Sequence, residues 1–443
     1  MKWLKNLKLK KEINLSFFFA LIYNSYRIES GIVNILNIIT KKKNKEELSY
    51  EELDYAFNGY LNKDIPDYQM TALLMAIVIN GMTFEETFNL TKIFINSGDV
   101  FTFDKEVCDK HSTGGIGDTV TLVAIPILGA LKVPVVKMSG RGLGITGGTI
   151  DKLESIPGYN VNLTKENYYD YLNKVGIVVG SQTDTLVPLD KVIYALRDVS
   201  GTTESIPLIA SSIMSKKIAC GASYILIDVK WGKGALVKNI EDANVLSNYL
   251  IEIGNRFDRK VKTVISDMNE PLSNCIGNAI EVEEAINVLK GEKNKLRDTS
   301  LEVASNLVSM YLNISYEDAL VKCEEVLDNE LAYDMFYRWI TNQGGDLSKL
   351  KVSDKIISIK SNQEGIISQI DALKVGELSV KLGAGRITKD SIIDYSVGIK
   401  LLKNTGDYVN KGDIIAKLYV NDLDINLNKD DITFYKIVNS NKL

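Results

Sequence analysis

The fold is decided by residues 109–154, DKHSTGGIGDTVTLVAIPILGALKVPVVKMSGRGLGITGGTIDKLE. A long apolar run, 120–131, and a short β-branched run, 133–136, lie between two Gly-rich loops, which predicts one helix and one strand between the loops. Each loop carries hydroxyls and a lysine. Glycine lets backbone N–H groups come close to a ligand, and N–H groups at a helix N-terminus bind anions. The two loops therefore predict one shared phosphate site.

A second interpretation of this stretch is a dinucleotide-binding turn. Gly142, Gly144 and Gly147 have the spacing GxGxxG and follow a predicted strand. That motif needs an acidic residue about 20 positions further on, at the end of a second strand. Asp151 and Glu154 come too early and belong to the next predicted helix. The dinucleotide interpretation is therefore disfavoured, as is that of two ordinary turns.

The two loops together resemble the thymidine/pyrimidine-nucleoside phosphorylase family. The segments 110–115, KHSTGG, and 139–154, SGRGLGITGGTIDKLE, carry the resemblance, which runs from about Ile32 almost to the C-terminus. It implies a multidomain α/β and α+β fold with an N-terminal extension at 1–31. A small all-helical, base-binding lobe is expected at 32–95 and 190–220, and an α/β phosphate-binding domain at 96–189 and 221–350. A β-rich, barrel-sandwich or hammerhead-like C-terminal domain is expected at 351–443.

Composition restricts the kinds of partner. The chain has 443 residues and a net charge of −5, so no large basic face for nucleic acid is predicted and phosphate specificity must be local. The four cysteines form no CxxC pair, which favours a reducing, cytoplasmic location. The single histidine, His111, excludes a multi-histidine metal site. No apolar stretch of 18 residues occurs, so no transmembrane helix and no membrane partner are expected.

Local signals predict several elements. Ser49 with Glu52, and Thr83 with Glu86, have the spacing of helix capping boxes. Asp67 is predicted to N-cap a further helix. Tyr168, Tyr169 and Tyr171 are predicted on a helix that belongs to the surface rather than to a functional site. The segments 365–367, 378–380 and 406–415 are predicted to form hairpin-like strands of a structural barrel, because no carrier-type lysine occurs at a hairpin tip.

A second candidate site lies in the segment 194–217. Ser212 and Lys216 are four residues apart and would share one face of a helix, with Ile209 one turn earlier. A serine, a lysine and an apolar wall suit a planar polar heterocycle. A solvated amphipathic helix is equally consistent with the spacing, although that interpretation fits Lys217 better than Lys216. In the family that the chain resembles, this motif lines the nucleobase pocket, and its form here is closer to the broad pyrimidine-nucleoside branch.

The resemblance implies a role for each matching residue. The catalytic set is His111, Arg197 and Lys216. The phosphate-binding set is Lys110, Ser112, Thr121, Lys137, Ser139 and Thr149. The base-binding set is Tyr194, Arg197, Ile209, Ser212 and Lys216. Ligands of a monovalent cation, K⁺, are expected at Gly117, Thr119, Leu272, Cys275 and Glu284.

One position departs from the family pattern. The family has His in the second Gly-rich loop where this chain has Ile145, so no contribution from a second histidine is expected. The N-terminal extension begins with lysines and contains a short apolar run, 17–23, without a clear cleavage motif. It is expected to be non-catalytic and dispensable. The resemblance also implies a homodimer.

The implied reaction is reversible phosphorolysis of uridine, thymidine or deoxyuridine in pyrimidine salvage. Inorganic phosphate is the co-substrate, and no organic cofactor is expected. One alternative is glycosyl transfer like that of anthranilate phosphoribosyltransferase, which would need a magnesium-bound pyrophosphate site. Another is a non-catalytic nucleoside-binding protein. The sequence leaves open whether ribose or deoxyribose, and uracil or thymine, is preferred.

Overall fold

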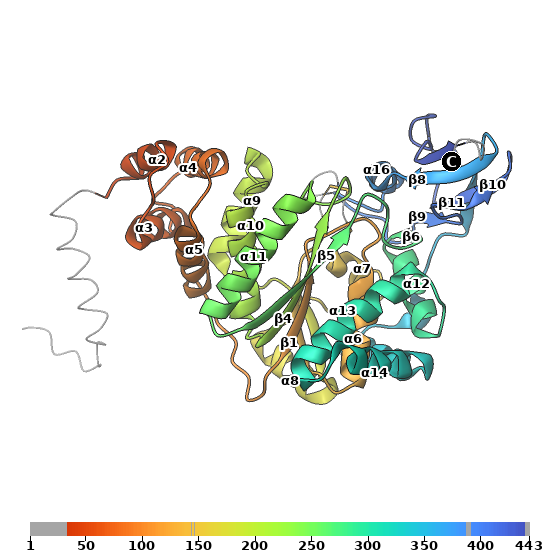
Figure 1. Cartoon of the computed structure of the whole chain (residues 1–443), viewed down its shortest axis with the longest axis horizontal. Helices are drawn as coiled ribbons and strands as arrows, with labels where there is room; N and C mark the ends of the chain where they lie inside the picture. The colour runs from red at the N-terminus through yellow and green to blue at the C-terminus, as the bar shows by residue number, and fades with distance from the viewer. Residues whose placement is uncertain (1–32, 143, 146, 387–390, 439–443) are drawn as a thin grey trace, which may run out of the picture.

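The computed structural model describes residues 33–142, 144–145, 147–386 and 391–438. A helical lobe lies at one end of the molecule, an α/β domain in the middle and a β-rich domain at the other end (Figure 1). The mixed α/β class with a helical bundle and C-terminal antiparallel sheets is as the sequence predicts. The N-terminal extension expected at 1–31 lies outside the described residues.

The helical lobe consists of four helices at the start of the described chain and two that return later. The first four are α2 (Ile35–Lys43), α3 (Tyr50–Leu61), α4 (Asp67–Asn80) and α5 (Phe84–Asn96). The returning pair is α9 (Pro188–Ser200) and α10 (Ile206–Ala219). Helix α9 packs on α3, α4 and α5, and α10 packs on α5. Segments about 100 residues apart in the sequence therefore build one lobe.

Both predicted capping boxes form, whereas the predicted cap at Asp67 is wrong. Ser49 and Thr83 each accept from the backbone three residues on, and Glu52 and Glu86 return the contact. Pro66 occupies the N-cap of α4 without a side-chain hydrogen bond, and Asp67 is the first helical residue. The fixed φ of proline and its missing N–H suit it to a helix start, which moves the boundary by one residue.

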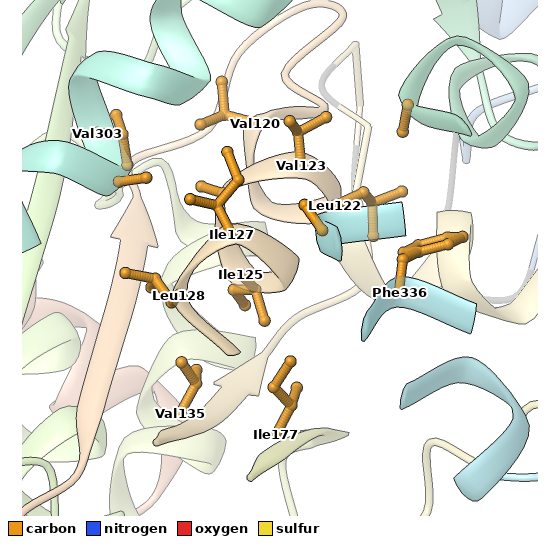
Figure 2. Packing of buried hydrophobic residues seen from close by; sticks show 14 of the residues in the cluster. Val120, Leu122, Val123, Ile125, Ile127, Leu128, Val135, Ile177, Val303 and Phe336 are labelled. Atoms are coloured by element: carbon orange, nitrogen blue, oxygen red, sulfur yellow. The ribbon is translucent and has the colours of Figure 1, made fainter. Parts of the chain in front are cut away.

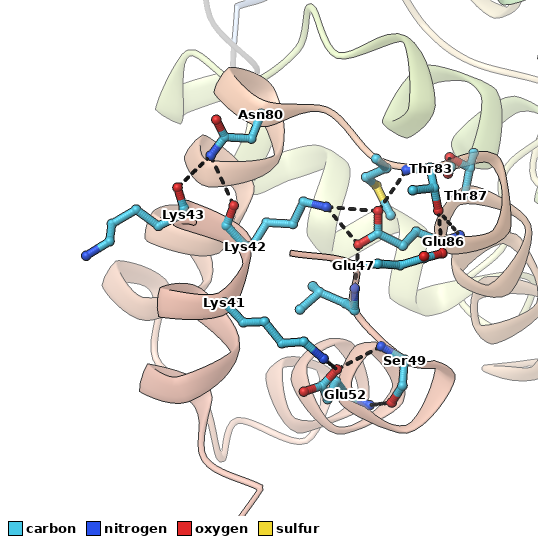
Figure 3. Close-up of polar contacts among 12 residues, drawn as sticks. Lys41, Lys42, Lys43, Glu47, Ser49, Glu52, Asn80, Thr83, Glu86 and Thr87 are labelled. Carbon is cyan, nitrogen blue, oxygen red and sulfur yellow. Dashed lines mark hydrogen bonds and ion pairs between the residues drawn. The ribbon is translucent and has the colours of Figure 1, made fainter. Parts of the chain in front are cut away.

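A buried ion pair stabilises the helical lobe. The Nζ of Lys42 donates to both carboxylate oxygens of Glu86, at 2.7 and 2.8 Å (Figure 3). The same carboxylate accepts from the backbone N–H of Leu48 and of Thr83. These hydrogen bonds offset the cost of burying the charge, and they join α2, α5 and the loop before α3.

The α/β domain is built on a five-stranded parallel sheet in the order β3-β2-β1-β4-β5. Its strands are β1 (Cys108–Ser112), β2 (Val135–Ser139), β3 (Ile177–Ser181), β4 (Tyr224–Trp231) and β5 (Lys260–Asp267). The helices around it are α6 (Val120–Ala130), α7 (Thr149–Glu154), α8 (Lys165–Val175), α11 (Ile240–Arg256), α12 (Ala279–Leu289), α13 (Lys295–Leu312), α14 (Tyr316–Asp328) and α15 (Leu331–Asn342). Because the strands are parallel, their carboxyl ends meet at one edge, where ligands bind in open α/β sheets.

The predicted helix and strand between the Gly-rich loops are α6 and β2. Helix α6 is buried on all sides from Val120 to Gly129, as its nearly unbroken apolar sequence requires. It packs between Val303 of α13, Phe336 of α15 and the strands β2 and β3 (Figure 2). The tyrosines predicted on a surface helix lie on α8, whose inner face carries Tyr168, fully buried against Phe101.

Within its described residues, the C-terminal domain contains two antiparallel sheets and one helix. Its elements are β7 (Lys355–Lys360), β8 (Gly365–Ile370), α16 (Ala372–Leu382), β9 (Gly398–Leu401), β10 (Tyr408–Val409), β11 (Ile414–Val420) and β12 (Tyr435–Val438). The predicted strand at 378–380 lies in α16 instead. Strands β10 and β11 belong to different sheets, so 406–415 is not a hairpin. Strand β6 (Cys275–Gly277) pairs with β9 and joins this domain to the α/β domain.

No helix within the described ranges is long and apolar enough to cross a membrane.

Candidate active site

The predicted phosphate residues gather at the carboxyl edge of the sheet. Lys110 and Ser112 lie on β1, and Ser139 ends the neighbouring strand β2. Thr121 is in the first turn of α6, and Thr149 is the first residue of α7. Two helix N-termini and the ends of two adjacent strands therefore meet, which is the arrangement that favours a bound anion.

The first loop holds its side chains in place through Asp118. The hydroxyl of Ser112 donates to Asp118 Oδ2 at 2.5 Å and accepts from the N–H of Gly114 at 3.2 Å. Burial raises the pKa of Asp118, but Lys110, Lys230, Lys152 and the hydrogen bond from Ser112 together lower it by more, so the net pKa lies below its ordinary value. The Nζ of Lys110 is 3.5 Å from the hydroxyl of Thr121, and burial lowers the pKa of Lys110. Lys110 is thus a buried lysine whose charged form is favoured by two nearby carboxylates, those of Asp118 and Asp228.

Beneath this loop lies a buried cluster of one aspartate and two lysines. Lys217 Nζ is 2.8 Å from Asp109 Oδ2, and Lys137 Nζ is 3.7 Å from Asp109 Oδ1. Lys137 also donates to the carbonyl of Lys110 at 2.5 Å. Burial, followed by the charge of Lys217, lowers the pKa of Lys137 to about 7. The side chain of Lys217 is 1% exposed, which contradicts the alternative of a solvated amphipathic helix at the residue that it fitted better.

His111 lies on β1 between two candidate phosphate residues, Lys110 and Ser112. Its side chain is half-buried at the end of β1. Burial lowers the pKa of His111 well below 6.5, and the nearby Lys217, Lys137, Lys216 and Lys110 lower it further. Its imidazole is therefore neutral near pH 7 in the unliganded chain, and one ring nitrogen carries a proton that it can donate in a hydrogen bond.

The residues predicted to bind the base lie on α9 and α10. A hydrogen bond between Lys216 and Asp190 joins the two helices. Lys216 Nζ donates to Ser212 Oγ at 2.8 Å and to Asp190 Oδ2 at 2.6 Å. The same ammonium lies 5.8 Å from the centre of the half-exposed Tyr194 ring. Ile209 is buried one turn before Ser212. The predicted shared helix face for Ser212 and Lys216 is therefore confirmed, and Asp190 is a partner that sequence spacing did not reveal.

Arg197 braces the connection between α9 and α10. Its guanidinium donates to three backbone carbonyls, those of Thr202 (3.0 Å), Thr203 (2.9 Å) and Leu208 (3.3 Å). It is 2% exposed, and burial lowers its pKa. The side chain thus stabilises the loop that positions Ile209 and Ser212.

The candidate cation residues bring several oxygen atoms together. The carbonyls of Gly117 and Cys275 both accept from Ser273 Oγ, at 2.7 and 3.0 Å. The Glu284 carboxylate accepts from the N–H of Cys275 at 2.9 Å, and burial raises its pKa to about 7. The hydroxyl of Thr119 points elsewhere, to Glu281 at 2.5 Å. Among the described residues, no three His, Cys, Asp or Glu side chains form a metal cluster, so a cation here would depend largely on carbonyls.

Two buried residues that hold the loops in place, Glu281 and Lys152, could not be found from sequence spacing. Glu281 accepts hydrogen bonds from Thr119 and from the N–H of Gly277 at 2.9 Å, and it forms an ion pair with Lys152 at 3.1 Å. Lys152 donates in addition to the carbonyl of Asp118 at 3.1 Å. Since α12 supplies Glu281 and α7 supplies Lys152, one buried ion pair joins the end of the first loop to the helix after the second.

Comparison with protein families gives three consecutive matches. Residues 36–98 match the glycosyl transferase family helical bundle domain, and residues 104–333 match the glycosyl transferase family a/b domain. Residues 366–431 match the pyrimidine nucleoside phosphorylase C-terminal domain. The order of the matches follows the lobe, the α/β domain and the C-terminal domain of the structure.

Curated relatives decide the family. The pyrimidine-nucleoside phosphorylase of Geobacillus stearothermophilus is 46% identical over 400 residues, 88% of this chain and 92% of the relative. That of Bacillus subtilis (strain 168) is 47% identical over the same shares. The chain belongs to the pyrimidine-nucleoside phosphorylase family. The predicted family and enzyme class, a pentosyltransferase of the glycosyltransferases, are thereby confirmed.

A solved structure supports the fold of this phosphorylase-family chain. Anthranilate phosphoribosyltransferase from Thermus thermophilus aligns with a TM-score of 0.57, covering 69% of this chain and 99% of that one. The two sequences are 16% identical, so this likeness concerns architecture alone. It supports the multidomain α/β fold that the sequence predicts.

Proposed function

We propose that this chain catalyses the reversible phosphorolysis of pyrimidine nucleosides in salvage. A phosphate oxygen forms a bond to C1′ as the bond from C1′ to the base nitrogen breaks, and the bonding electron pair leaves with the base. The products are the free base and ribose or deoxyribose 1-phosphate. The observation that carries the proposal is the place of His111 on β1, between the candidate phosphate ligands Lys110 and Ser112, and close enough to Lys216 of the candidate base set for that charge to lower the pKa of His111.

On the phosphate side, the proposal assigns the ligands predicted from the sequence. They are Lys110, Ser112, Thr121, Lys137, Ser139 and Thr149. Their support is their convergence at two helix N-termini and two strand ends. Hydroxyls and N–H groups that point to one place bind an anion without reorganising, and buried lysines add charge. Phosphate held there would present an oxygen to the sugar.

On the base side, negative charge develops as the base leaves. Lys216 is the assigned donor to that charge, oriented by Asp190 and Ser212. Neutral His111 can donate a hydrogen bond to the base carbonyl, and Tyr194 and Ile209 provide the apolar wall. Arg197 supports this set. Its guanidinium is engaged with backbone carbonyls, so a direct contact with the base would require it to exchange one of them. Losing one preorganised donor to developing charge costs roughly 10²–10³ in rate.

Further parts of the proposal concern the cation, the assembly and the domains. K⁺ is assigned to the carbonyls of Gly117, Thr119, Leu272 and Cys275 with Glu284, because backbone carbonyls are suitable K⁺ ligands. A cytoplasmic homodimer is proposed; all four cysteines are buried and free, which suits a reducing compartment. The domain limits proposed are those expected from the resemblance, with the base lobe at 32–95 and 190–220.

The test is a product analysis with purified enzyme. Uridine, thymidine and deoxyuridine are each incubated with inorganic phosphate, and release of free base and sugar 1-phosphate is measured. Phosphate-dependent release supports the proposal, and the three rates give the substrate preference. Turnover only with phosphoribosyl pyrophosphate would support the anthranilate-like alternative. Tight nucleoside binding without any turnover would support a non-catalytic binding protein.

A further inference from the structure

We infer that the C-terminal domain positions the phosphate-binding loops, through Gly376 and Arg386. This inference rests on the proposed function, because it concerns how phosphate is held. Neither residue touches the candidate phosphate ligands directly. Both contact the loops from the C-terminal domain, which contains none of the candidate site residues.

The first contact is apolar and involves both Gly-rich loops. Gly376 lies in the middle of α16, and a Cβ added there would come 2.7 Å from Ile116 Cδ1. The same Cβ would come 3.1 Å from Ile145 Cβ and from the Ile145 carbonyl oxygen. Ile116 belongs to the first loop and Ile145 to the second, and both pack against the hydrophobic core of the C-terminal domain. Residues of both loops therefore pack against α16 at the same position, Gly376.

The second contact is ionic and involves the second loop alone. Arg386 Nη1 donates to Asp151 Oδ1 at 2.6 Å, with side chains 12% and 3% exposed. The other oxygen of Asp151 accepts from the N–H of Gly142 at 2.6 Å. Arg386 also contacts the loop backbone, since its Nη1 is 3.3 Å from the Gly142 carbonyl and its own carbonyl accepts from the N–H of Gly144 at 3.1 Å. The arginine thus fixes the loop at two glycines.

These contacts act on phosphate through helix α7. Asp151 lies two residues after Thr149, the candidate ligand at the start of α7. The carboxylate ties the loop to the first turn of this helix, and Arg386 holds that carboxylate in place. A helix of six residues has little stability of its own, so its orientation depends on such external contacts. Moving its N-terminus would move Thr149 and the adjacent N–H groups away from the phosphate position.

The residue of the second loop that meets α16 is Ile145. An isoleucine can pack on α16, but its side chain cannot donate or accept a hydrogen bond. Ile145 is therefore held by apolar contact with the C-terminal domain. This makes phosphate binding depend on the integrity of α16, whose residue Gly376 leaves room for the isoleucine.

Three variants and one control test the inference. Arg386→Ala removes the ionic contact. Arg386→Lys keeps the positive charge but lacks the planar guanidinium, whose N–H groups can donate to the carboxylate and to the loop carbonyl together. Gly376→Ala pushes on Ile116 and Ile145 while improving the helix propensity of α16, so it tests the position of the loops without weakening the helix. Lys381→Ala is the matched control, because Lys381 is on the same helix and pairs with Asp431 at 2.5 Å, away from the loops.

The readouts are the Kd of inorganic phosphate by calorimetry, the KM of phosphate and the KM of uridine at saturating phosphate. For Arg386→Ala and Gly376→Ala we expect the phosphate constants to rise, by up to about 10²-fold, since small displacements of positioning groups have effects of that order. The KM of uridine should change far less, Arg386→Lys should recover part of the loss, and Lys381→Ala should match the wild type.

Unchanged phosphate Kd in both Arg386→Ala and Gly376→Ala would overturn the inference. So would an equal loss of uridine and phosphate affinity, which indicates general damage. If Arg386→Ala fails to fold, Gly376→Ala alone decides, because it breaks no ion pair. A wild type that binds phosphate without phosphorolysis refutes the proposed function, while the calorimetric comparison still tests the positioning role.

Discussion

At the scale of single residues, the site depends on charges that are buried close together. Lys137 and Lys217 both lie beside Asp109, and Lys110 lies near Asp118 and Asp228. Burial is the main cause that lowers the pKa of Lys110 and of Lys137, and neighbouring lysines lower both pKa values further. A bound phosphate would supply the missing negative charge. Without an anion, the buried lysines are therefore held partly in the neutral form. Phosphate binding should favour their charged form and be accompanied by proton uptake.

The first prediction is proton uptake by Lys137 on phosphate binding. Its pKa of about 7 in the unliganded chain leaves it largely neutral at about pH 8, and a neighbouring dianion raises that pKa again. Calorimetry at about pH 8 in buffers of different ionisation enthalpy should show net proton uptake. Lys137→Gln should bind phosphate more weakly and lose most of the uptake. Equal uptake in the two proteins would show that another group carries the proton.

The second prediction concerns Glu284 and a monovalent cation. Burial raises the pKa of Glu284 from 4.5 to about 7, so the folded chain retains a proton that the unfolded chain has released. Stability from this group is therefore full below about pH 4.5 and is lost as the pH rises through about 7. A K⁺ ion beside the carboxylate would offset that loss. KCl should thus raise Tm at about pH 8 and much less at about pH 5.

The comparison for this prediction is choline chloride at equal ionic strength. Glu284→Gln should remove the K⁺-specific rise in Tm. Glu283→Gln is the matched control, since Glu283 is the exposed neighbour on the same helix. A K⁺ effect that persists in Glu284→Gln would contradict the cation assignment.

At the scale of elements, the helical lobe depends on one buried carboxylate. Glu86 is fully buried and accepts from Lys42, Leu48 and Thr83. The third prediction is that Glu86→Ala lowers the free energy of unfolding of this lobe by about 3–5 kcal/mol, because it leaves the charge of Lys42 buried and unpaired. Hydrogen exchange of the amides of α2, α3 and α5 measures that free energy locally.

A double variant distinguishes the attraction between Lys42 and Glu86 from the cost of leaving one charge buried without its partner. Lys42→Met combined with Glu86→Leu removes both charges and should be less destabilising than Glu86→Ala alone. Asp170→Ala breaks the exposed pair of Asp170 with Lys174 and should have little effect. If Glu86→Ala exchanged like the wild type, the lobe would owe its stability to apolar packing instead.

At the scale of the whole molecule, the two candidate substrate sites are carried by different parts. The phosphate residues lie on β1, β2, α6 and α7, whereas the base residues lie on α9 and α10. Reacting atoms must approach to about 3–3.5 Å. We expect the connections at 104–108, 187–189 and 219–222 to act as hinges. Val187 has φ of 50°, a strained conformation for a β-branched residue, directly before α9.

The fourth prediction is compaction when both substrates are bound. Small-angle scattering with phosphate and an unreactive nucleoside analogue should give a smaller radius of gyration than scattering without ligands. Closure would also exclude water from the cationic sugar. Phosphate alone serves as the control. An unchanged radius with both ligands shown to be bound by calorimetry would contradict closure and leave the residue roles intact.

The sequence alone determined features whose physical causes are local. The capping boxes at Ser49 and Thr83 depend on hydrogen bonds across three residues. The helix and strand between the Gly-rich loops follow from a continuous apolar run, which can only be buried. The shared face of Ser212 and Lys216 follows from the pitch of one helix. The family followed from the two loop motifs, because their residues are adjacent in sequence.

The tertiary structure decided which charges meet across the chain. Neighbouring residues on a helix point about 100° apart, so only the packing of α10 could place Lys217 in the core and Lys216 at the site. Asp109 with Lys217, and Asp151 with Arg386, are separated by more than 100 residues. The energy of such pairs depends on burial and on distance in space. Sequence spacing carries neither quantity, and the role of the C-terminal domain therefore emerged only from the fold.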